Sequence, residues 1–204
     1  NGVYLGADRY LIGVNDPQEY TEQMEDSRIA SLKKLVNRWD AKVMLVPTAD
    51  NILTDKLPAF APHYDETRLL AKVKESVGEE HYIDVYSALQ EHAREPIYYR
   101  TDHHWTSLGA YYGFLAWADS MGKFPYPYNT AGMKTVSEDF QGTLQSRINV
   151  AWTKDRIQYF PETEKKPVTV TYDFADTADS LYAPKYLETK NQYGFFLNDN
   201  HAFI

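Results

Sequence analysis

The sequence contains one dense cluster of polar and aromatic side chains, between residues 98 and 109. Within it, Asp102, His103, His104 and Trp105 are consecutive, just before a segment with a helical pattern. A hydrolase needs an imidazole to take a proton from a hydroxyl group and a carboxylate to orient that imidazole and stabilise its charged form. Asp102 and His104 are two residues apart, which lets a carboxylate in a turn reach a ring nitrogen of the second histidine. The cluster is therefore a candidate catalytic site in which Asp102 and His104 could form a proton-transfer pair; the alternative is that the histidines are ordinary turn residues.

The neighbouring polar residues allow more than one interpretation. Arg100 could neutralise Asp102, bind an acidic substrate or form a plain surface salt bridge. Trp105 could pack the cluster against the core or stack on a sugar ring. Near the C-terminus, Asn200 and His201 could line the same site as hydrogen-bond donors or form a turn. We therefore count Arg100, Trp105, Asn200 and His201 as candidate substrate-binding residues.

The same cluster contains the side-chain types that bind zinc. Asp102, His103, His104 and His201 could offer oxygen and nitrogen ligands. However, adjacent histidines rarely point at one ion, and the sequence has no His-x-x-x-His pair. Paired histidines can also be turn residues whose rings bind backbone carbonyls. We predict neither a metal site nor a cofactor.

The elements before the cluster predict a parallel sheet. Apolar residues recur at helical spacing in two segments, a short apolar run ends at a proline, and a second apolar run leads into a third helix. These are helices over 26–39 and 66–77, strands over 42–48 and 81–86, and a helix over 87–93 that Ser87 could cap. This order implies right-handed crossovers and a sheet covered by helices. Ligands bind beyond the carboxyl ends of such strands, where the cluster follows.

The remaining segments frame this core. Residues 3–12 predict a strand, a tight turn and a strand, 54–65 a long surface loop, and 106–121 a helix capped by Thr106 or Ser107 and ended by Gly122. Residues 123–204 are rich in Pro, Tyr, Thr and Asp, with β-like pieces at 156–160, 168–174 and 193–197. We predict one domain over 1–204, with an α/β core (1–122) and a β-rich elaboration (123–204).

Composition narrows the possible partners. The 204 residues suffice for one domain with a core, and the net charge of −8 disfavours nucleic acid as a ligand. There is no cysteine, which excludes disulfides and thiolate metal sites, and no apolar run approaches the ~20 residues of a membrane span. The 17 tyrosines suit sugar stacking or a half-buried core equally.

A family resemblance covers nearly the whole chain. Residues 98–113, with the sequence YYRTDHHWTSLGAYYG, resemble the signature of the DHHW protein family of Gram-positive-type bacteria. Further resemblance is carried by four blocks: Gly6–Leu11, Val46–Thr48, Asp139–Leu144 and Phe195–His201. That family is similar to the SGNH-like domains of alginate O-acetylation enzymes, which carry Thr-Asp-Thr-His-Trp at the equivalent place. The resemblance implies an SGNH-hydrolase-like, flavodoxin-like fold.

The resemblance also implies a function. It points to an extracytoplasmic O-acetyltransferase or acetylesterase, at the cell surface or secreted, that acts on a cell-envelope or secreted polysaccharide. Asp102 and His104 match the catalytic pair, and His103 takes the position of a threonine as a substrate-binding residue. A membrane-bound acyltransferase is expected to supply the acetyl group, and an export segment is expected outside these residues.

One departure from the resemblance concerns the nucleophile. In the similar enzymes, a serine follows the histidine motif on a strand and turn resembling Lys-Asp-Ser-Tyr, and this chain has no such block. Three Asp-Ser pairs occur, at Ser27, Ser120 and Ser180, but none follows a short apolar strand. We therefore expect the domain to be incomplete at its C-terminus, with the nucleophile outside this chain. The alternative is a non-catalytic polysaccharide-binding or assembly protein on the same scaffold.

Overall fold

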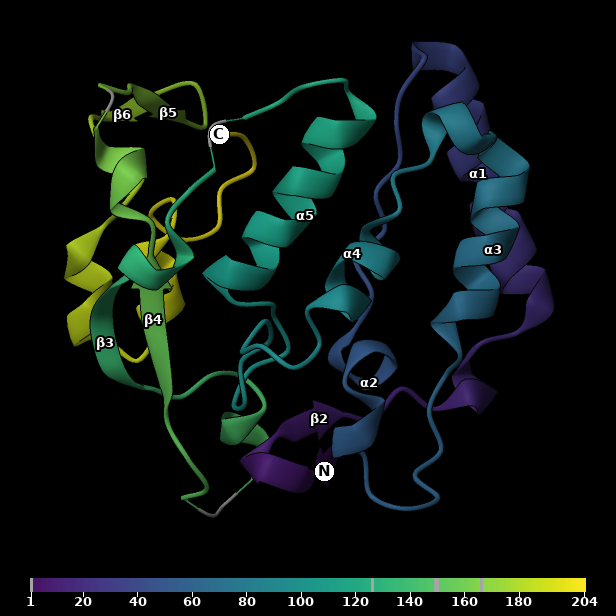
Figure 1. Ribbon diagram of the computed structural model, residues 1–204, viewed down its shortest axis with the longest axis horizontal. Coiled ribbons are helices and arrows are strands. Elements are labelled where there is room, and N and C mark those ends of the chain that lie inside the picture. Colours follow the sequence, from purple (N-terminus) through teal and green to yellow (C-terminus); the bar gives the residue numbers. More distant parts are fainter. Residues whose placement is uncertain (1, 126, 149–150, 166) are drawn as a thin grey trace.

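The computed structural model describes residues 2–125, 127–148, 151–165 and 167–204 (Figure 1). The helices are α1 (Glu22–Trp39), α2 (Ala49–Ile52), α3 (Glu66–Val77), α4 (Val85–Glu91) and α5 (Ser107–Ser120). The strands are β1 (Val3–Leu5), β2 (Leu11–Gly13), β3 (Lys134–Phe140), β4 (Asp155–Tyr159), β5 (Val170–Tyr172) and β6 (Asp176–Ala178). Short 3₁₀ helices cover Ala7–Arg9, Pro17–Glu19, Thr54–Lys56, Glu79–His81, Thr130–Gly132, Gln145–Arg147, Pro161–Glu164, Pro184–Glu188 and Gln192–Phe195.

Each of the longer helices begins at a side-chain cap, and these caps fix where the helices lie in the sequence. The Thr21 hydroxyl accepts a hydrogen bond from the Met24 amide at the start of α1, and Asp65 accepts one from the Thr67 amide at the start of α3. Thr106 caps α5, as one of the two predicted alternatives. The helix predicted over 66–77 is therefore confirmed to the residue, while α1 begins four residues before its predicted start.

The helices pack in two groups, which Figure 1 shows side by side. On the right, α1 and α3 run next to each other. They bury a cluster formed by Ile29, Val36, Val43, Leu70, Val73, Val77 and Tyr82. In the centre, α4 and α5 pack together around a second cluster that includes Ile12, Ile52, Val85, Leu89, Ile97 and Leu108. This second cluster carries the segment that contains the Asp102–Trp105 motif.

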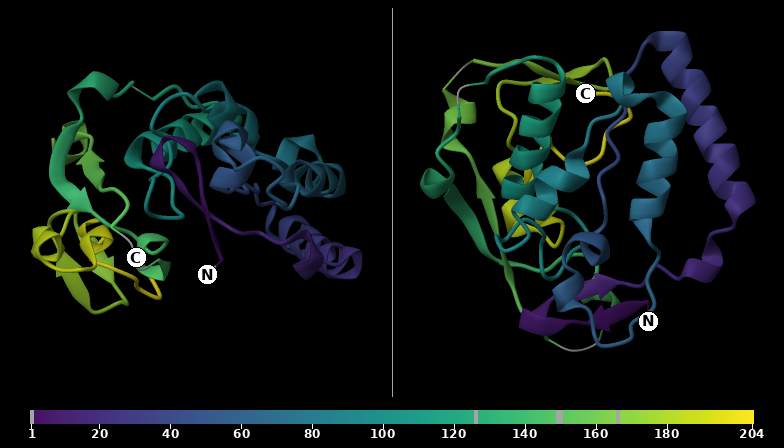
Figure 2. Two further views of the ribbon diagram at one scale, coloured as in Figure 1. Left: turned by 90° about the horizontal axis from the view of Figure 1, so that it is seen from below. Right: turned by 45° about the vertical axis from the view of Figure 1, so that its right-hand side comes forward.

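The C-terminal residues form a third, aromatic cluster on the other side of the molecule, as the view from below shows (Figure 2). Strands β3 and β4 pair antiparallel, from Lys134 opposite Tyr159 to Phe140 opposite Asp155, with two irregularities in the register. The buried members of this cluster are Tyr99, Phe140, Ile157, Tyr159 and Phe195. Tyr99 comes from the motif segment, so the C-terminal residues pack directly against it.

The predicted parallel sheet is reduced to one contact. Val43 and Tyr82 form a parallel bridge, in which the Val43 amide donates to the His81 carbonyl (2.7 Å) and the Ile83 amide donates to the Val43 carbonyl (2.9 Å). The assigned strands of the described residues instead form three antiparallel pairs, β1–β2, β3–β4 and β5–β6. The chain contains both helices and strands, as predicted, but the segments 42–48 and 81–86 meet at this single bridge and do not form an extended parallel sheet.

Two of the expected strands, over 81–86 and 193–197, differ for local reasons. Asp84 accepts a hydrogen bond from the Ser87 amide and starts α4, so Val85 and Tyr86 are helical and Ser87 is not the cap. Residues 193–197 carry a 3₁₀ turn and a single antiparallel bridge between Tyr182 and Phe196. The strand–turn–strand over 3–12 and the strands within 156–160 and 168–174 are confirmed in outline. In the described residues, no helix combines the length and apolarity that a membrane crossing needs.

Candidate active site

The motif lies on a loop that turns back on itself between the core and α5. Tyr98 and Trp105 form an antiparallel bridge, and the Tyr99 amide donates to the His104 carbonyl at 3.2 Å. The Thr106 hydroxyl donates to the Pro96 carbonyl (2.7 Å) and caps α5. The loop is therefore closed at its base, and its tip carries residues 100–104.

Asp102 and His104 form a hydrogen-bonded pair at this tip. The distance between His104 Nδ1 and Asp102 Oδ1 is 2.5 Å, and the His104 amide donates to the same oxygen at 3.0 Å. Since an ionised carboxylate only accepts hydrogen bonds, Nδ1 carries the proton in this pair, and Nε2 of a neutral His104 is a free base. This is the arrangement by which a carboxylate orients a general base. The predicted pair is therefore formed.

Thr143 supplies the rest of the Asp102 environment. Its amide (2.7 Å) and hydroxyl (3.0 Å) both donate to Asp102 Oδ2, from just beyond β3. Burial alone would raise the pKa of Asp102, which is 3% exposed, but the hydrogen bonds from His104 and Thr143 outweigh it and hold the pKa well below its usual value. Asp102 is therefore ionised at neutral pH.

A second carboxylate fixes the loop from β4. Asp155 accepts hydrogen bonds from the Arg100 amide (3.0 Å), the Thr101 amide (2.7 Å) and the Thr101 hydroxyl (2.6 Å). Thr101 is fully buried, and its hydroxyl accepts from the Gly142 amide at 3.1 Å. A Cβ atom on Gly142 would lie 2.3 Å from Asp102 Oδ2, so only glycine lets this backbone approach the carboxylate.

His103 lies beside the Asp102–His104 pair and, like Asp102, is hydrogen-bonded to the Thr143 hydroxyl. The distance between His103 Nδ1 and the Thr143 hydroxyl oxygen is 2.7 Å, and the rings of His103 and His104 are 3.9 Å apart. Because the Thr143 hydroxyl donates to Asp102, His103 Nδ1 must be the donor to Thr143. Burial, and then the neighbouring charge of His104, lower the pKa of His103. A neutral His103 is therefore expected at neutral pH.

The pair opens into a cavity of 840 Å³. Tyr193 forms one wall and stacks on the His104 ring at 4.6 Å between centroids, with an angle of 11° between the planes. Burial raises the pKa of Tyr193 to about 12, so its hydroxyl stays protonated. Other lining residues include His103, Phe140, Gly142, Thr143, Ser146, Phe196, Asn200 and His201.

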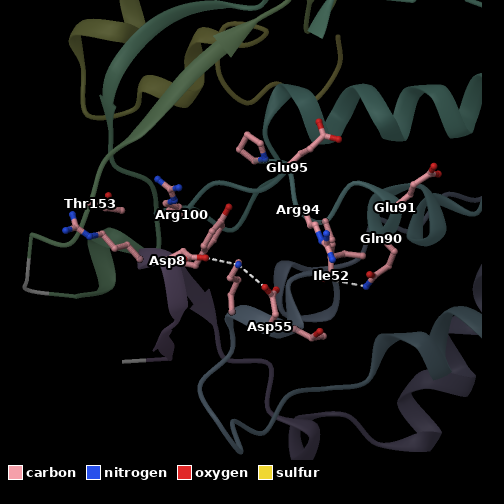
Figure 3. Close-up of a pocket in the computed structure, with 15 residues that line it drawn as sticks. Asp8, Ile52, Asp55, Gln90, Glu91, Arg94, Glu95, Arg100 and Thr153 are labelled. Atoms are coloured by element: carbon pink, nitrogen blue, oxygen red, sulfur yellow. Dashed lines mark hydrogen bonds and ion pairs between the residues drawn. The ribbon is translucent and has the colours of Figure 1, made fainter. Parts of the chain in front are cut away.

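Some of the predicted site residues line this cavity, and others do not. Asn200 and His201 line the cavity, as does His103, although their binding roles stay predictions. Trp105 packs inward on α5, where a Cβ atom on Gly113 would lie 2.7 Å from its ring. Arg100 points to a larger cavity of 1,120 Å³ that lacks His104, and its guanidinium lies over the Tyr10 ring at 5.6 Å. Asp102 and His104 therefore do not line the larger cavity (Figure 3).

Several residues of the site are not predicted by the sequence. Thr143 and Gly142 lie in the Asp139–Leu144 block, which the sequence marks only by its resemblance to the family. Asp155 carries no local pattern, and the β-like pattern at 193–197 does not predict a contact between Tyr193 and His104. Their role follows from contacts over long sequence distances, 41 residues for Thr143 with Asp102 and 54 for Asp155 with Thr101.

The serines of the three Asp-Ser pairs lie away from the pair. Ser27 is in α1, Ser120 is the last residue of α5, and Ser180 accepts from the Tyr182 amide. In the described part of the chain, none of them lines the cavity of His104, but Ser146 does, with its hydroxyl donating to the Gly142 carbonyl at 3.3 Å.

Asp102, His103 and His104 are the one group among the described residues that could hold a metal ion, with ligand atoms within 4.8 Å of one another. Both Nδ1 atoms are already hydrogen-bonded, to Thr143 and Asp102. An ion would therefore compete with these bonds or bind through Nε2 atoms. The prediction that the chain uses no metal stays a prediction.

Comparisons with known proteins identify the family and the fold. Residues 14–189 match the family described as "SGNH hydrolase-like domain, acetyltransferase AlgX". Among solved structures, the chain is similar to a DHHW family protein from Eubacterium siraeum (23% identity, TM-score 0.70, 98% of this chain and 69% of that one). It is also similar to PatB1 of Bacillus cereus (16%, 0.66, 98% and 74%) and to the O-acetyltransferase domain of Pseudomonas putida AlgJ (21%, 0.57, 77% and 63%). No curated protein sequence matches the chain.

Proposed function

Because this chain belongs to the family of SGNH hydrolase-like domains of the AlgX acetyltransferase type, we propose that it transfers or hydrolyses O-acetyl groups of a polysaccharide outside the cytoplasm. The observation that carries the proposal is the hydrogen-bonded pair of Asp102 and His104, which opens into a cavity. A bacterial cell envelope or a secreted polysaccharide is the expected setting, and a membrane-bound acyltransferase is the expected source of acetyl groups.

The proposed chemistry proceeds in two steps. His104 Nε2 takes the proton of a serine hydroxyl while the serine oxygen bonds to the acetyl carbonyl carbon. The protonated His104 then gives this proton to the leaving oxygen, which departs and leaves an acetylated serine. In the second step, a sugar hydroxyl or water gives its proton to His104 Nε2 while its oxygen bonds to the acetyl carbon. The bond to the serine oxygen then breaks, and His104 returns the proton to the serine. Asp102 keeps His104 in the required tautomer and stabilises its charged form.

The serine of this mechanism has two candidate sources. The sequence prediction places it outside this chain, on the strand and turn that the similar enzymes carry. Ser146 is an alternative, since it lines the same cavity as His104. Its hydroxyl donates to the Gly142 carbonyl, and it lies inside the 3₁₀ helix Gln145–Arg147 and not on a sharp turn after an apolar strand. We therefore favour the first source.

The walls of the cavity support a sugar as the ligand. Tyr193 and Phe196 offer aromatic surface, and Asn200 adds a polar side chain to the lining. Both ring nitrogens of His201 are already hydrogen-bonded, to Asp173 and to the Asn198 carbonyl. The aromatic surface equally supports the second candidate, a non-catalytic polysaccharide-binding or assembly protein. The two functions differ in whether His104 is needed for turnover.

The decisive experiment uses the product of the complete source gene and its His104→Ala variant. We expect the wild type to release acetate from an acetylated polysaccharide, and His104→Ala to lower kcat by about 10³-fold or more, because the general base is lost. Glycan binding should be retained. A wild type that binds the glycan without turnover, or a variant with unchanged turnover, would refute catalysis by this pair and favour the binding function.

A labelling experiment then locates the nucleophile. A sulfonyl fluoride reacts with an activated serine, and the labelled peptide is identified by mass spectrometry. We expect label on a serine outside these 204 residues, and less of it in His104→Ala. Label on Ser146, lost in Ser146→Ala together with turnover, would instead assign the nucleophile to this chain.

A further inference from the structure

The imidazole ring of His104 lies between two other rings. The His103 ring is 3.9 Å away and tilted by 37°, and the Tyr193 ring is 4.6 Å away and tilted by only 11°. His103 and Tyr193 form no ring contact with each other in the described part of the chain, although rings up to 6.5 Å apart are in contact elsewhere, so they lie on opposite sides of His104. Since its edge is bonded to Asp102, the base is held at one edge and on both faces.

The turn that carries Tyr193 is fixed to strand β3. Tyr193 belongs to the 3₁₀ helix Gln192–Phe195. The side chain of Gln192 accepts a hydrogen bond from the Ser137 hydroxyl (2.7 Å) and donates one to Asp139 (3.2 Å), and both of these residues are in β3. These two bonds restrict the movement of Tyr193 away from His104.

Strand β3 therefore holds both members of the catalytic pair. Just beyond its end, the Thr143 amide and hydroxyl donate to Asp102, at 2.7 and 3.0 Å. Through Gln192, the same strand holds the ring that stacks on His104. The carboxylate and the imidazole are thus set relative to each other by one strand that lies outside the motif loop.

The stack brings the face of Tyr193 to the ring that gains a charge in the reaction. Among the rings around Tyr193, that of His104 is the nearest, and those of Phe196, Phe140 and Tyr99 are 5.6, 6.3 and 6.3 Å away. The electron-rich face of a tyrosine attracts a cation that lies within about 6 Å of the ring centre. Because His104 becomes charged when it takes the serine proton, this attraction is stronger in the transition state than in the resting enzyme.

We propose that Tyr193 is a positioning residue for the acetyl-transfer reaction: it holds the His104 ring against Asp102 and stabilises the charged form of that ring. The inference rests on the proposed function, because the charge appears on His104 only during that reaction. The contribution of Tyr193 is expected in kcat, since the substrate is bound before His104 is charged. A tyrosine that only stacks on a bound sugar would instead change KM.

The first measurement follows the proton between His104 and Asp102 in the chain itself. Tyr193→Phe keeps the stacked ring and Tyr193→Leu removes it, with Tyr193→Met in place of the latter if urea unfolding shows that it does not fold. The control is Tyr128→Leu, which removes a half-buried tyrosine stacked on Tyr111 (5.5 Å, 12°). Proton NMR measures how fast the His104 Nδ1 proton exchanges with water, and the signal is assigned by its absence in His104→Ala.

We expect this proton to exchange about fivefold faster in Tyr193→Leu, because the ring that holds His104 against Asp102 is gone. In Tyr193→Phe and in Tyr128→Leu, the exchange rate should change less than about twofold.

The second measurement is turnover by the product of the complete source gene. Tyr193→Leu should lower kcat about tenfold and leave KM within about twofold, because the lost contact acts on the charged His104. Tyr193→Phe should keep at least about half of kcat, since a phenyl ring offers a similar face, and so should Tyr128→Leu.

Three results would overturn the proposal. The first is unchanged proton exchange and kcat in a folded Tyr193→Leu variant, and the second is a raised KM with unchanged kcat, which would make Tyr193 a substrate-binding surface. The third is an equal loss of kcat in Tyr193→Phe, which would assign the effect to the hydroxyl. A wild type without turnover would refute the proposed function, whereas faster exchange in Tyr193→Leu would still show that Tyr193 holds His104 in place.

Discussion

The replacement Asp102→Asn tests how strongly the site is tied into the fold. The carboxylate of Asp102 accepts four hydrogen bonds, two from His104 and two from Thr143, and is 3% exposed. An asparagine side chain has the same shape but only one acceptor oxygen. Its NH₂ group must then face either the His104 or the Thr143 donors. The backbone amide on that side loses its acceptor.

The expected cost follows from this loss. A buried amide without an acceptor costs about 1–3 kcal/mol, and the remaining hydrogen bonds lose the strength that the charge gave them. We therefore expect Asp102→Asn to lower the free energy of unfolding by about 2–4 kcal/mol at pH 7. The exposed Asp119 of α5 provides the matched control, because Asp119→Asn should change this free energy by less than about 0.5 kcal/mol.

The pH dependence gives a second readout of the same contacts. The pKa of Asp102 is held below its usual value, so its stabilisation is fully present above the pKa of the unfolded chain, about 3.9. It is lost as the pH falls through the lower pKa of the folded state. The stability difference between the wild type and Asp102→Asn should therefore shrink below about pH 4.

Urea unfolding at pH 7 and at several values down to pH 3 measures both effects. A difference below about 0.5 kcal/mol at pH 7, or one that stays constant down to pH 3, would refute the assignment of Asp102 as an ionised, fourfold acceptor.

Two further predictions concern the packing of the motif and the rim of the cavity. Gly113→Ala places a methyl group 2.7 Å from the Trp105 ring and should lower the free energy of unfolding by about 1–3 kcal/mol, measured in urea; an unchanged midpoint would show that the ring can move away freely. His201 lies 2.9 Å from Asp173, whose other oxygen accepts from the Phe203 amide at 3.0 Å. The hydrogen bond to Asp173 raises the pKa of His201, so the pair is complete below about pH 6.5 and is lost as the pH rises through the raised value. Hydrogen exchange of the Phe203 amide, corrected for intrinsic rates, should show this loss of protection as the pH rises, and His201→Gln should remove the pH dependence. If protection of this amide in the wild type does not depend on pH, His201 does not hold Asp173 in place.

The sequence predicted best what local chemistry determines. The apolar spacing and the Asp65 cap define α3, and Thr106 defines the start of α5. The Asp102–His104 pair was also accessible, because two residues of one turn find each other without help from distant segments. The spacing of residues along the chain therefore predicts helices and short-range hydrogen-bonded pairs, but not the distant residues that pack around them.

The errors arise where distant segments decide the structure, or where a local cap or turn replaces an expected strand. The segments around Val43 and Tyr82 have the composition of buried strands, yet they meet at a single bridge, and Asp84 then starts a helix. Strand β3 was missed because Thr, Ser, Glu and Asp dominate its seven residues, which pair with β4 and not through an apolar pattern. Tyr193 was placed in an expected strand, but it stacks on His104 from a 3₁₀ turn.

The two anchors of the motif loop bear on the kinetics of folding. The loop closes its own base early, because the partners at Tyr98 and Trp105 are seven residues apart. Its tip, however, is held by Asp155 across 54 residues and by Thr143 across 41. Contacts at such separation form slowly, because the intervening chain loses freedom before they contribute. We therefore expect the base of the motif loop to close first during refolding, and the geometry of Asp102 and His104 to be fixed only with a later cooperative step. A ribosome-bound chain would acquire it only after β4 has emerged from the exit tunnel.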